Sequence, residues 1–312
     1  MNVLKKEETL VKEIFSRDVF KGRVLFGEPM KRHTSLRIGG PADVLAFPEN
    51  IVSLRHVLRL ARDADTPITP IGKGTNVLVK DKGIRGIVVS LCMFNELRVE
   101  DERFTIIADS GLLLQEIVAL SRKTGLKGIE GLSGIPGTLG GAIAGNSGAF
   151  GYEIKDVIID ISMMDALGNI SLYDVRDVVF GYRSVKLPHG FFITRATLRL
   201  LPDDPMDVSK RIDGFLKERK SIQPIGKRSA GCVFKNPRGV SAGKLIDSAG
   251  CKGMRAGDIE VSEKHANFFI NKGNGNAEDF LRLMEMVSSK VKKKFGVILK
   301  PEIKIIGGET AD

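Results

Sequence analysis

The order of helices and strands along this chain predicts an α+β fold rather than a doubly wound parallel sheet. Apolar runs typical of strands follow one another at 157–166 and 170–173, with only a Leu-Gly-Asn turn between them. Glycines are concentrated at 130–151, and Pro-Asp-Asp-Pro at 202–205 is the clearest linker. At 312 residues, the chain is long enough for roughly two domains or more.

The individual elements follow from the spacing of apolar residues. In the first half, helices are expected at 7–18, at 50–63 with Asn50 as its cap, and at 112–123 with Gly125 at its end. Short extended pieces are expected within 34–49, and strands at 67–72, 84–91 and 103–111. A short helix from Asp174 to Phe180 and an alternating strand at 191–200 come next. Beyond the linker, the pattern predicts helices at 206–220, 242–249 and 277–294 and strands at 265–271 and 297–306.

Cysteine and histidine usage excludes several classes of protein. Cys92, Cys232 and Cys251 form no CxxC pair, and the four histidines have no metal-ligand spacing. A disulfide scaffold and a bound metal are therefore not expected, and a reducing cytoplasm is the expected location. No apolar run approaches the ~18 residues of a membrane span, and the first residues lack the apolar block of a signal peptide.

The net charge of +10 favours an acidic partner. The densest basic run, Lys-Val-Lys-Lys-Lys at 290–294, ends a predicted helix, where cations interact favourably with the helix dipole. The chain has no Trp and only three Tyr, and it has no basic motif interleaved with aromatic residues. A solvated helix end is therefore favoured over a nucleic-acid surface. A phosphorylated small molecule would explain a positive cleft equally well.

Eight glycines within 130–151 indicate a close approach between backbone and ligand, because each glycine costs conformational entropy on folding. Such a backbone can lie against a flat or phosphorylated ligand with its N–H groups directed at it. A second segment, GKGTNVLV at 72–79, follows a predicted strand but matches neither GxGxxG nor GxxxxGK[ST]. Taken alone, this second segment is more typical of a hairpin turn than of a phosphate loop.

Eight motifs follow one another between residues 30 and 306. They are TSLRIGGPAD, GKGTNVLV, GIPGTLGGAIAGNSGAFG, FGYRSV, SAGCVFKNP, AGKLIDSAG, HANFFIN and LKPEI. In this order they resemble the UDP-N-acetylenolpyruvoylglucosamine reductases, FAD-dependent enzymes of peptidoglycan precursor synthesis. The resemblance implies a two-lobed α+β FAD-binding domain, of the PCMH and vanillyl-alcohol-oxidase type, followed by a C-terminal α+β substrate domain. The expected divisions are an N-terminal helix at 1–19, FAD-binding lobes at 20–92 and 93–201, and the substrate domain at 202–312.

The family's reaction is the NADPH-dependent reduction of UDP-GlcNAc-enolpyruvate to UDP-N-acetylmuramate. By motif match, FAD would bind non-covalently, with two glycine segments around its pyrophosphate and three residues nearer its isoalloxazine ring. The first segment is Gly72, Lys73, Gly74, Thr75, Asn76, Val77 and Leu78. The second is Ser133, Gly134, Ile135, Pro136, Gly137, Thr138, Gly140 and Gly141, and the residues nearer the ring are Asn146, Gly148 and Ala149. NADPH would reduce the flavin and leave, so that the second substrate binds at the same face.

The resemblance also implies the catalytic residues. Hydride from the flavin would add to the vinyl carbon, the charge on the neighbouring carbon and carboxylate would be stabilised, and an acid would protonate the α-carbon. The stabilising groups would be Arg183 in GYRS and Glu302 in KPE, and the proton donor would be Cys232 in SAGCVFKNP. Many relatives carry serine at this last position, and a thiol, with a reference pKa of about 8.5, is the stronger acid. Without the other motifs, Cys232 would be assigned to the core and the two charged residues to the surface.

The resemblance places the remaining contacts on the substrate. Its diphosphate and carboxylate would be held by Lys220, Lys235, Asn236, His265 and Lys304. The segment 184–201 is too short for an extra loop with a substrate-binding tyrosine, so the chain is similar to the loop-less subgroup. Two alternatives are a same-fold flavin oxidase of alcohols or sugars and a flavin-free basic nucleotide-binding protein. Neither nucleic acid nor a membrane is an expected partner, and a monomer is favoured.

Overall fold

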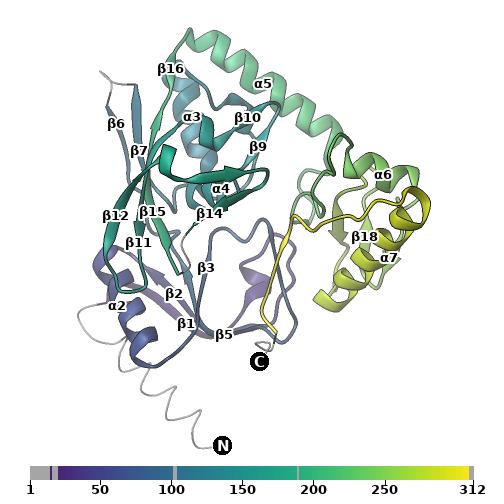
Figure 1. Cartoon of the computed structure of the whole chain (residues 1–312), viewed down its shortest axis with the longest axis horizontal. Helices are drawn as coiled ribbons and strands as arrows, with labels where there is room; N and C mark the ends of the chain where they lie inside the picture. Colours follow the sequence, from purple (N-terminus) through teal and green to yellow (C-terminus); the bar gives the residue numbers. More distant parts are fainter. Residues whose placement is uncertain (1–14, 16–19, 101–103, 188–189, 309–312) are drawn as a thin grey trace, which may run out of the picture.

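The computed structural model of the chain describes residue 15 and residues 20–100, 104–187 and 190–308. The helix expected at 7–18 lies outside these residues except for Phe15. In the described part, helices and mixed sheets follow one another irregularly, which confirms the expected α+β class. Two lobes built on sheets lie together, and a C-terminal part rich in helices stands beside them (Figure 1).

The first lobe is a four-stranded sheet with one helix against it. Its strand order is β1 (Gly22–Pro29), β2 (Pro41–Pro48), β5 (Ile84–Ser90) and β3 (Ile68–Ile71). β1 is antiparallel to β2, whereas β5 is parallel to both β2 and β3. Helix α2 (Ile51–Asp63) lies between β2 and β3 in the chain, as such parallel connections require. Asn50 caps α2 as expected, because its side-chain oxygen accepts a hydrogen bond from the Ser53 N–H at 2.9 Å.

The second lobe is a five-stranded antiparallel sheet. Its strand order is β12 (Ile170–Asp174), β11 (Ile158–Met164), β15 (Phe192–Arg199), β7 (Thr105–Asp109) and β6 (Leu97–Glu100). Helix α3 (Leu114–Thr124) shares a hydrophobic core with this sheet, in which Ile106, Ile117 and Ile161 are fully buried. The helix ends at Gly125, whose φ of 67° suits glycine. The strands expected in this lobe and the helix expected at 112–123 are confirmed. β6 was not expected from the sequence.

The glycine-rich stretch lies on the second lobe as a series of short pieces. They are a 3-10 turn at Glu130–Leu132, helix α4 (Leu139–Ala144), the hairpin β9 (Gly148–Ala149) and β10 (Tyr152–Glu153), and a 3-10 turn at Ile154–Asp156. Leu139, Ala142 and Ile143 are buried in the core of the lobe. Thr138 caps α4, since its hydroxyl oxygen accepts a hydrogen bond from the Gly141 N–H at 3.3 Å. A few apolar side chains therefore anchor a backbone that is otherwise free to meet a ligand.

The segment after β12 differs from the expectation. The helix expected from Asp174 to Phe180 is wrong, because the chain makes only one 3-10 turn at Val175–Asp177. It continues as β13 (Val179–Gly181), which pairs with β14 (Ser184–Lys186) in a hairpin. The residues at 178–180 are Val, Val and Phe, and such β-branched and aromatic side chains favour a strand.

Helix α5 (Pro205–Ile222) runs from the second lobe to the C-terminal part (Figure 1). There, α6 (Ala242–Ser248) and α7 (Ala277–Phe295) accompany a three-stranded sheet of β17 (Arg255–Ala256), β18 (Ile259–Val261) and β19 (Phe269–Asn271). The helices expected at 206–220, 242–249 and 277–294 are confirmed as α5, α6 and α7. The strands expected at 265–271 and 297–306 are shorter than expected, since only β19 and β20 (Lys304–Ile306) are regular.

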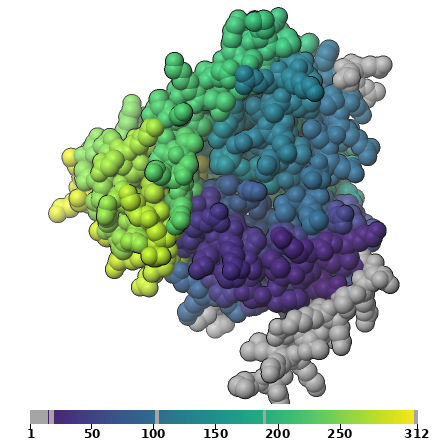
Figure 2. All heavy atoms as spheres, turned by 180° about the vertical axis from the view of Figure 1, so that it is seen from behind, coloured from purple at the N-terminus to yellow at the C-terminus, as the bar shows by residue number. Residues whose placement is uncertain are grey.

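Two features join the C-terminal part to the first lobe, against which it packs (Figure 2). Strand β20 pairs in parallel with β4 (Val77–Val79). Leu36, Ile38 and Leu78 of the first lobe belong to the same hydrophobic cluster as Phe269 and Phe280. A further short pair, β8 (Leu126–Lys127) with β16 (Leu201–Pro202), and a 3-10 turn at Met30–Arg32 complete the elements of the described residues. The domain divisions expected from the sequence stay a prediction.

Two features of the described residues concern a membrane and a metal ion. Among them, no helix combines the length and the apolar character that crossing a membrane requires. Nor does the described part of the chain bring three or more His, Cys, Asp or Glu side chains together as a metal site.

Candidate active site

The expected proton donor lies in an irregular strand between two neighbours. On one side, the Lys235 N–H donates to the Lys300 carbonyl at 2.8 Å, and the Glu302 N–H donates to the Val233 carbonyl at 2.8 Å. On the other side, Cys232 faces Phe268 in an isolated antiparallel bridge. These pairings bring together three segments that lie far apart in the sequence, and they place Glu302 beside Cys232.

Arg183 reaches this place from the second lobe. It occupies the turn of the β13–β14 hairpin, where Gly181 pairs with Ser184, and its φ of 52° is unusual for a residue other than glycine. Its Nε lies 3.2 Å from Oε1 of Glu302 but is not aligned for a hydrogen bond, so the guanidinium keeps donors for a ligand. Its carbonyl accepts a hydrogen bond from Nζ of Lys235 at 3.3 Å. Arg183 is therefore held from both sides by the C-terminal part.

The surroundings keep both acids of the cluster protonated more than usual. Burial raises the pKa of the Cys232 thiol from its ordinary value of 9.0 to about 12, and the nearby Glu302 carboxylate adds to this, while Arg183 opposes it. Burial likewise raises the pKa of Glu302, although Arg183 and Lys235 oppose the shift. The cluster thus combines a thiol that retains its proton at neutral pH with a guanidinium and a carboxyl group whose pKa is raised.

Arg219 belongs to the same cluster and is missing from the sequence prediction, which named its neighbour Lys220. It is buried at the end of α5, and its Nε donates to the Ser133 carbonyl at 3.1 Å. Its Nη2 is buried and makes no hydrogen bond to any residue that the structure describes, and the Arg219 charge acts on Cys232 and Arg183. Arg219 lies at helical spacing after Val208 and Ile212, which is the signal that identifies it as inward-facing.

The two expected FAD segments lie against each other. The Thr75 hydroxyl donates to the Pro136 carbonyl at 3.1 Å, and a Cβ on Gly72 would lie 2.9 Å from the Thr138 hydroxyl oxygen. At Gly74, with φ of 65°, a Cβ would lie 2.1 Å from the His33 carbonyl oxygen, so only glycine fits there. The two glycine segments therefore form one continuous backbone surface.

Unpartnered polar atoms mark the same surface as the site of a ligand. Ser133 Oγ, Asn146 Oδ1 and Ser110 Oγ are buried without a hydrogen-bond partner among the described residues. Buried polar groups are normally paired, so these atoms indicate a bound group with donors and acceptors of its own. The Asn146 Nδ2 donates to the Gly181 carbonyl at 3.1 Å, which links this surface to the hairpin that carries Arg183. A glycine backbone with unpaired polar atoms beside it is what FAD binding requires, so the residues present fit this cofactor.

The remaining expected substrate residues lie in several places. Asn236 accepts a hydrogen bond from the Ala242 N–H at 2.9 Å, so its side chain holds the start of α6. The His265 ring packs on Phe268 with centroids 4.8 Å apart, beside the Cys232 bridge. Lys304 is an exposed residue of β20.

Lys220 lies apart from these, at a hollow of about 790 Å³ near the end of α5. Four more cations line this hollow, and they are Lys227, Arg228, Lys264 and Lys272. The Lys220 carbonyl accepts a hydrogen bond from Nζ of Lys264 at 2.6 Å, which joins the end of α5 to the opposite wall. Glu260 and Glu263 also line it, and Glu260 pairs with Lys272 at 3.2 Å. The remaining excess of cations makes the hollow suitable for an anionic group.

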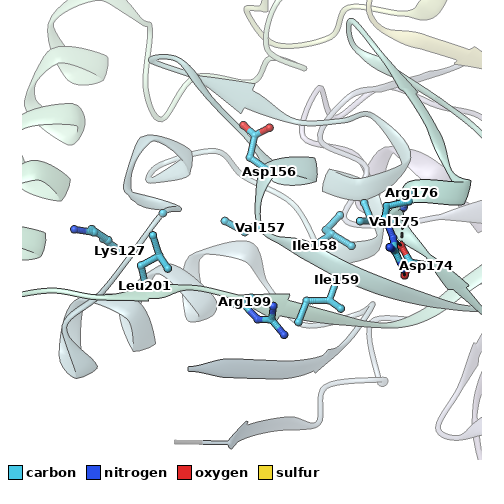
Figure 3. A pocket seen from close by; sticks show the side chains of 11 residues that line it. Lys127, Asp156, Val157, Ile158, Ile159, Asp174, Val175, Arg176, Arg199 and Leu201 are labelled. Carbon is cyan, nitrogen blue, oxygen red and sulfur yellow. Dashed lines mark hydrogen bonds and ion pairs between the residues drawn. The ribbon is translucent and has the colours of Figure 1, made fainter. Parts of the chain in front are cut away.

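A second hollow, of about 580 Å³, lies in the second lobe and contains none of the expected site residues (Figure 3). Its charged lining is largely neutralised, because Arg176 pairs with Asp174 at 2.6 Å and Asp156 pairs with Lys155 at 3.1 Å. No buried polar atom without a partner lines it among the described residues. The hollow therefore lacks the unpaired polar atoms that Arg183 and Arg219 contribute to the Cys232 cluster.

Comparisons with known proteins agree with this geometry. A family model described as "FAD binding domain" matches residues 42–172, and one described as "UDP-N-acetylenolpyruvoylglucosamine reductase, C-terminal domain" matches residues 223–306. The UDP-N-acetylenolpyruvoylglucosamine reductase of Clostridium tetani is 41% identical over 281 residues, which cover 90% of this chain and 91% of that protein. The enzyme of the same name from Caldanaerobacter subterraneus is 43% identical over 288 residues, covering 92% and 95% of the two chains.

A solved structure gives the same result for the fold. The crystal structure of UDP-N-acetylenolpyruvylglucosamine reductase from Thermus caldophilus matches with a TM-score of 0.78 at 33% identity, over 92% of this chain and 99% of that one. The expected fold class, a two-lobed FAD-binding domain with a C-terminal α+β domain, is confirmed. Identities of this size along nine-tenths of both chains leave one conclusion, which is that the chain belongs to the UDP-N-acetylenolpyruvoylglucosamine reductase family.

Proposed function

We propose that Arg183, Cys232 and Glu302 carry out the reduction that this family performs. As a member, the chain is an enzyme that uses NADPH and FAD to convert UDP-GlcNAc-enolpyruvate to UDP-N-acetylmuramate in peptidoglycan precursor synthesis. The two glycine segments would hold FAD, which would supply the hydride that the reaction takes from NADPH. The observation that carries the proposal is the convergence of these three side chains from three separate segments.

The first requirement of the reaction is to stabilise negative charge. Addition of hydride to the vinyl carbon leaves charge on the neighbouring carbon and on the attached carboxylate. The Arg183 guanidinium has donors free for this charge, and Glu302, in its protonated form, donates a hydrogen bond to it. Both groups are fixed before substrate arrives, so little reorganisation accompanies the reaction.

The second requirement is a proton for the α-carbon. The Cys232 thiol holds its proton at neutral pH, because burial raises its pKa to about 12. Transfer of this proton to the α-carbon leaves a thiolate, and the charges of Arg183 and Arg219 both favour that thiolate. Cys232 thus acts as the general acid, and a proton from solvent restores it.

Binding is shared among the remaining groups. The glycine segments 72–78 and 133–141 hold the cofactor, with Asn146, Gly148 and Ala149 nearer the ring. The free Nη2 of Arg219 binds an anionic group at the junction of these segments with the Cys232 cluster. Lys220 and the basic hollow around it suit the diphosphate of the substrate. Lys235, Asn236, His265 and Lys304 are proposed as further substrate contacts from the resemblance alone.

The proposal is tested by separating the two half-reactions under anaerobic conditions. The purified protein should be yellow, its colour should bleach with NADPH, and UDP-GlcNAc-enolpyruvate should restore the colour. In Cys232→Ala, bleaching should proceed as in the wild type while restoration becomes slow. Fast restoration in that variant would place the proton donor elsewhere. Because the reaction uses NADPH and a nucleotide-linked sugar, we propose a cytoplasmic enzyme. The monomer favoured by the sequence analysis stays a prediction, which light scattering can check.

A further inference from the structure

The first of the eight motifs, TSLRIGGPAD at 34–43, contributes no residue to the expected site. In the structure it begins with a tight turn, in which the Thr34 hydroxyl donates to the Ile38 carbonyl at 2.8 Å. Leu36 and Ile38 are buried in the hydrophobic cluster that the first lobe shares with the C-terminal part. The turn is therefore anchored on both sides of Ser35, whose backbone is held in one place.

Ser35 joins two segments of the site. Its N–H donates to the Gly74 carbonyl at 3.0 Å, in the glycine segment 72–78 that would hold FAD. Its hydroxyl donates to the Ser229 carbonyl at 2.6 Å, three residues before Cys232. The Gly74 carbonyl lies farther from the hydroxyl oxygen, at 3.3 Å, and because a hydroxyl carries one hydrogen, the shorter contact takes it. One residue thus holds the FAD segment with its backbone and the approach to Cys232 with its side chain.

The stretch from Ser229 to Cys232 depends on contacts at its ends. It contains Gly231, whose φ of 76° lies in the region that glycine adopts without steric cost, so local preference does not fix its path. After Cys232, the backbone is held by the pairings described above for the irregular strand. Before Cys232, the bond from Ser35 holds the Ser229 carbonyl. Loss of this bond would therefore loosen the chain on the side where Cys232 is approached.

Glu302, the other acid of the site, has its own link to the FAD segment. Nδ2 of Asn76 donates to the Glu302 carbonyl at 3.3 Å, and the Asn76 carbonyl accepts from the first N–H of β20 at 3.0 Å. The FAD segment is thus linked to both acids. Hydride and proton have to reach neighbouring carbons of one substrate, so the distance between this segment and Cys232 has to be set closely.

We infer that Ser35 is a positioning residue for the proton donor: by binding Gly74 and Ser229 together, it sets the distance between the FAD segment and Cys232. The inference rests on the proposed function of Cys232. Ser35→Ala keeps the backbone bond to Gly74 and loses only the hydroxyl, so the cofactor should stay in place while the proton donor is held less closely. A purely structural hydroxyl would affect stability and leave the proton-transfer step unchanged.

Ser121 offers a matched control in the second lobe. It is fully buried in α3, and its hydroxyl donates to the Leu126 carbonyl. Ser121→Ala therefore removes the same group and the same kind of bond, and neither Ser121 nor Leu126 belongs to a segment that carries the expected site. Ser35→Thr is the conservative variant, because it keeps a hydroxyl at position 35.

The first experiment compares Ser35→Ala and Ser121→Ala in the FAD-loaded enzyme. Ser35→Ala should leave reduction by NADPH within about twofold of wild type and slow reoxidation by UDP-GlcNAc-enolpyruvate about 5- to 50-fold, in kcat rather than in KM. The solvent deuterium isotope effect on reoxidation should rise, because a misplaced acid makes proton transfer more limiting. Ser121→Ala should change neither quantity, and Ser35→Thr should recover most of the rate. A rate or an isotope effect in Ser35→Ala equal to that in Ser121→Ala would overturn the inference.

The second experiment needs no turnover. Alkylation of the substrate-free enzyme by iodoacetamide, followed by mass spectrometry of the cysteine peptides, should be about 3- to 10-fold faster at Cys232 in Ser35→Ala than in wild type. Cys92 is exposed and reports the reagent, whereas Cys251 is buried and reports general opening of the chain. Both should react as in wild type. An unchanged rate at Cys232, or an equal rise at Cys251, would contradict a local positioning role.

Two further variants keep the test decisive. If Ser35→Ala does not fold, Ser35→Cys keeps the size but has only a weak donor, and wild-type reoxidation in that variant would also overturn the inference. Combining Ser35→Ala with Cys232→Ala should slow reoxidation little beyond Cys232→Ala alone. Rapid reoxidation in Cys232→Ala itself would remove the proposed function, whereas a slow Cys232→Ala with a normal Ser35→Ala would remove only the positioning role.

Discussion

The surroundings of Cys232 weaken the acidity of its thiol but leave it able to donate a proton. In water a thiol is a stronger acid than an alcohol, and a large fraction of ordinary thiols is ionised near pH 9. Here burial and the Glu302 carboxylate raise the pKa of the thiol to about 12, while Arg183 and Arg219 oppose this shift. The thiol therefore remains an acid that is protonated throughout the physiological range.

This environment leads to a prediction for the pH dependence of the substrate half-reaction. The active form of Cys232 is the protonated one, so a raised pKa extends activity toward alkaline pH. Between pH 7 and pH 10, the rate constant of reoxidation by substrate should show no loss attributable to Cys232, since its pKa is about 12. Stopped-flow measurement across this range checks the prediction, with Cys232→Ser as the control. A loss of rate with a midpoint near 9 that is absent from Cys232→Ser would contradict it.

Two replacements of Cys232 should show how far the rate depends on having a protonated group at this position. Cys232→Ala removes the proton donor and should slow the substrate half-reaction by roughly 10²- to 10⁴-fold. Cys232→Ser retains a protonated group at the same position and should recover a large part of this loss. Single-turnover reoxidation of the reduced enzyme measures both. Equal rates in the two variants would show that the group at 232 is not the acid.

We expect Arg183 to stabilise the negative charge that develops on the substrate rather than to bind the cofactor. In Arg183→Ala, Glu302 loses its ion-pair partner and the substrate loses a guanidinium, so kcat should fall by about 10²-fold or more. FAD content, read from the visible spectrum, should remain near that of wild type. Arg183→Lys should restore only part of the rate, because an ammonium lacks the planar pair of donors. A loss of FAD equal to the loss of rate would instead indicate a cofactor-binding role.

At this scale, the sequence predicts the residues that lie in motifs and misses those whose role depends on packing. Arg183, Cys232 and Glu302 each lie in a short motif, and their roles were predicted from the resemblance that the eight motifs carry together. Arg219 was missed, although its helical spacing from the buried residues of α5 indicates an inward position. The pairing of the buried Asn267 amide with the Phe234 peptide was missed because the two residues lie 33 positions apart in sequence.

Among the elements, long amphipathic helices were predicted best, because their signal repeats over many residues. α2, α5 and α7 begin and end within about two residues of the expectation. β1, β6 and β14 were not predicted, and the start of β13 was assigned to a helix that was expected to end at Phe180. These strands are short or lie at sheet edges, where cross-strand partners rather than local preference determine the structure.

The start of α7 provides a test of an element that is capped from another part of the chain. The Asp81 carboxylate accepts from the Ala277 N–H at 3.0 Å and from the Glu278 N–H at 3.1 Å, in addition to the cap from Asn276. Asp81→Ala should reduce the free energy of unfolding by about 1 to 2 kcal/mol, because two helix N–H groups lose their acceptor.

Chemical denaturation of the FAD-loaded enzyme measures this change. Glu285→Ala is the matched control, since Glu285 is exposed on the same helix and away from its start, and its effect should be within about 0.5 kcal/mol. An effect of Asp81→Ala no larger than that of the control would show that water replaces the carboxylate at no cost.

For the whole molecule, the central feature is that the C-terminal part completes the first lobe. The strand at 297–306 was predicted in part, but its pairing with β4 was not, because no local pattern identifies a partner over 200 residues away. The same applies to the Ser35 hydroxyl, which donates to the Ser229 carbonyl at 2.6 Å. Contacts of this kind depend on the complete arrangement of the chain and are available only from the structure.

This arrangement predicts that residues 20–201 do not form a stable FAD-binding unit without residues 202–312. In the isolated fragment, β4 would lose its parallel partner and Leu36, Ile38 and Leu78 would lose the cluster that contains Phe269. Exposure of three fully buried apolar side chains costs about 1.5 to 3 kcal/mol each, which is a large share of the stability of a typical domain.

The fragment should therefore show a broad, weakly cooperative thermal transition by circular dichroism and little FAD absorbance after gel filtration with excess cofactor. Addition of a separately purified fragment 202–312 should restore both the cooperative transition and the yellow colour, because the shared cluster and the β20–β4 pairing can form again between two chains. A fragment 20–201 that unfolds cooperatively and binds FAD as tightly as the whole chain would show that the glycine segments need no support from β20. In that case the C-terminal part would contribute only its side chains to the active site.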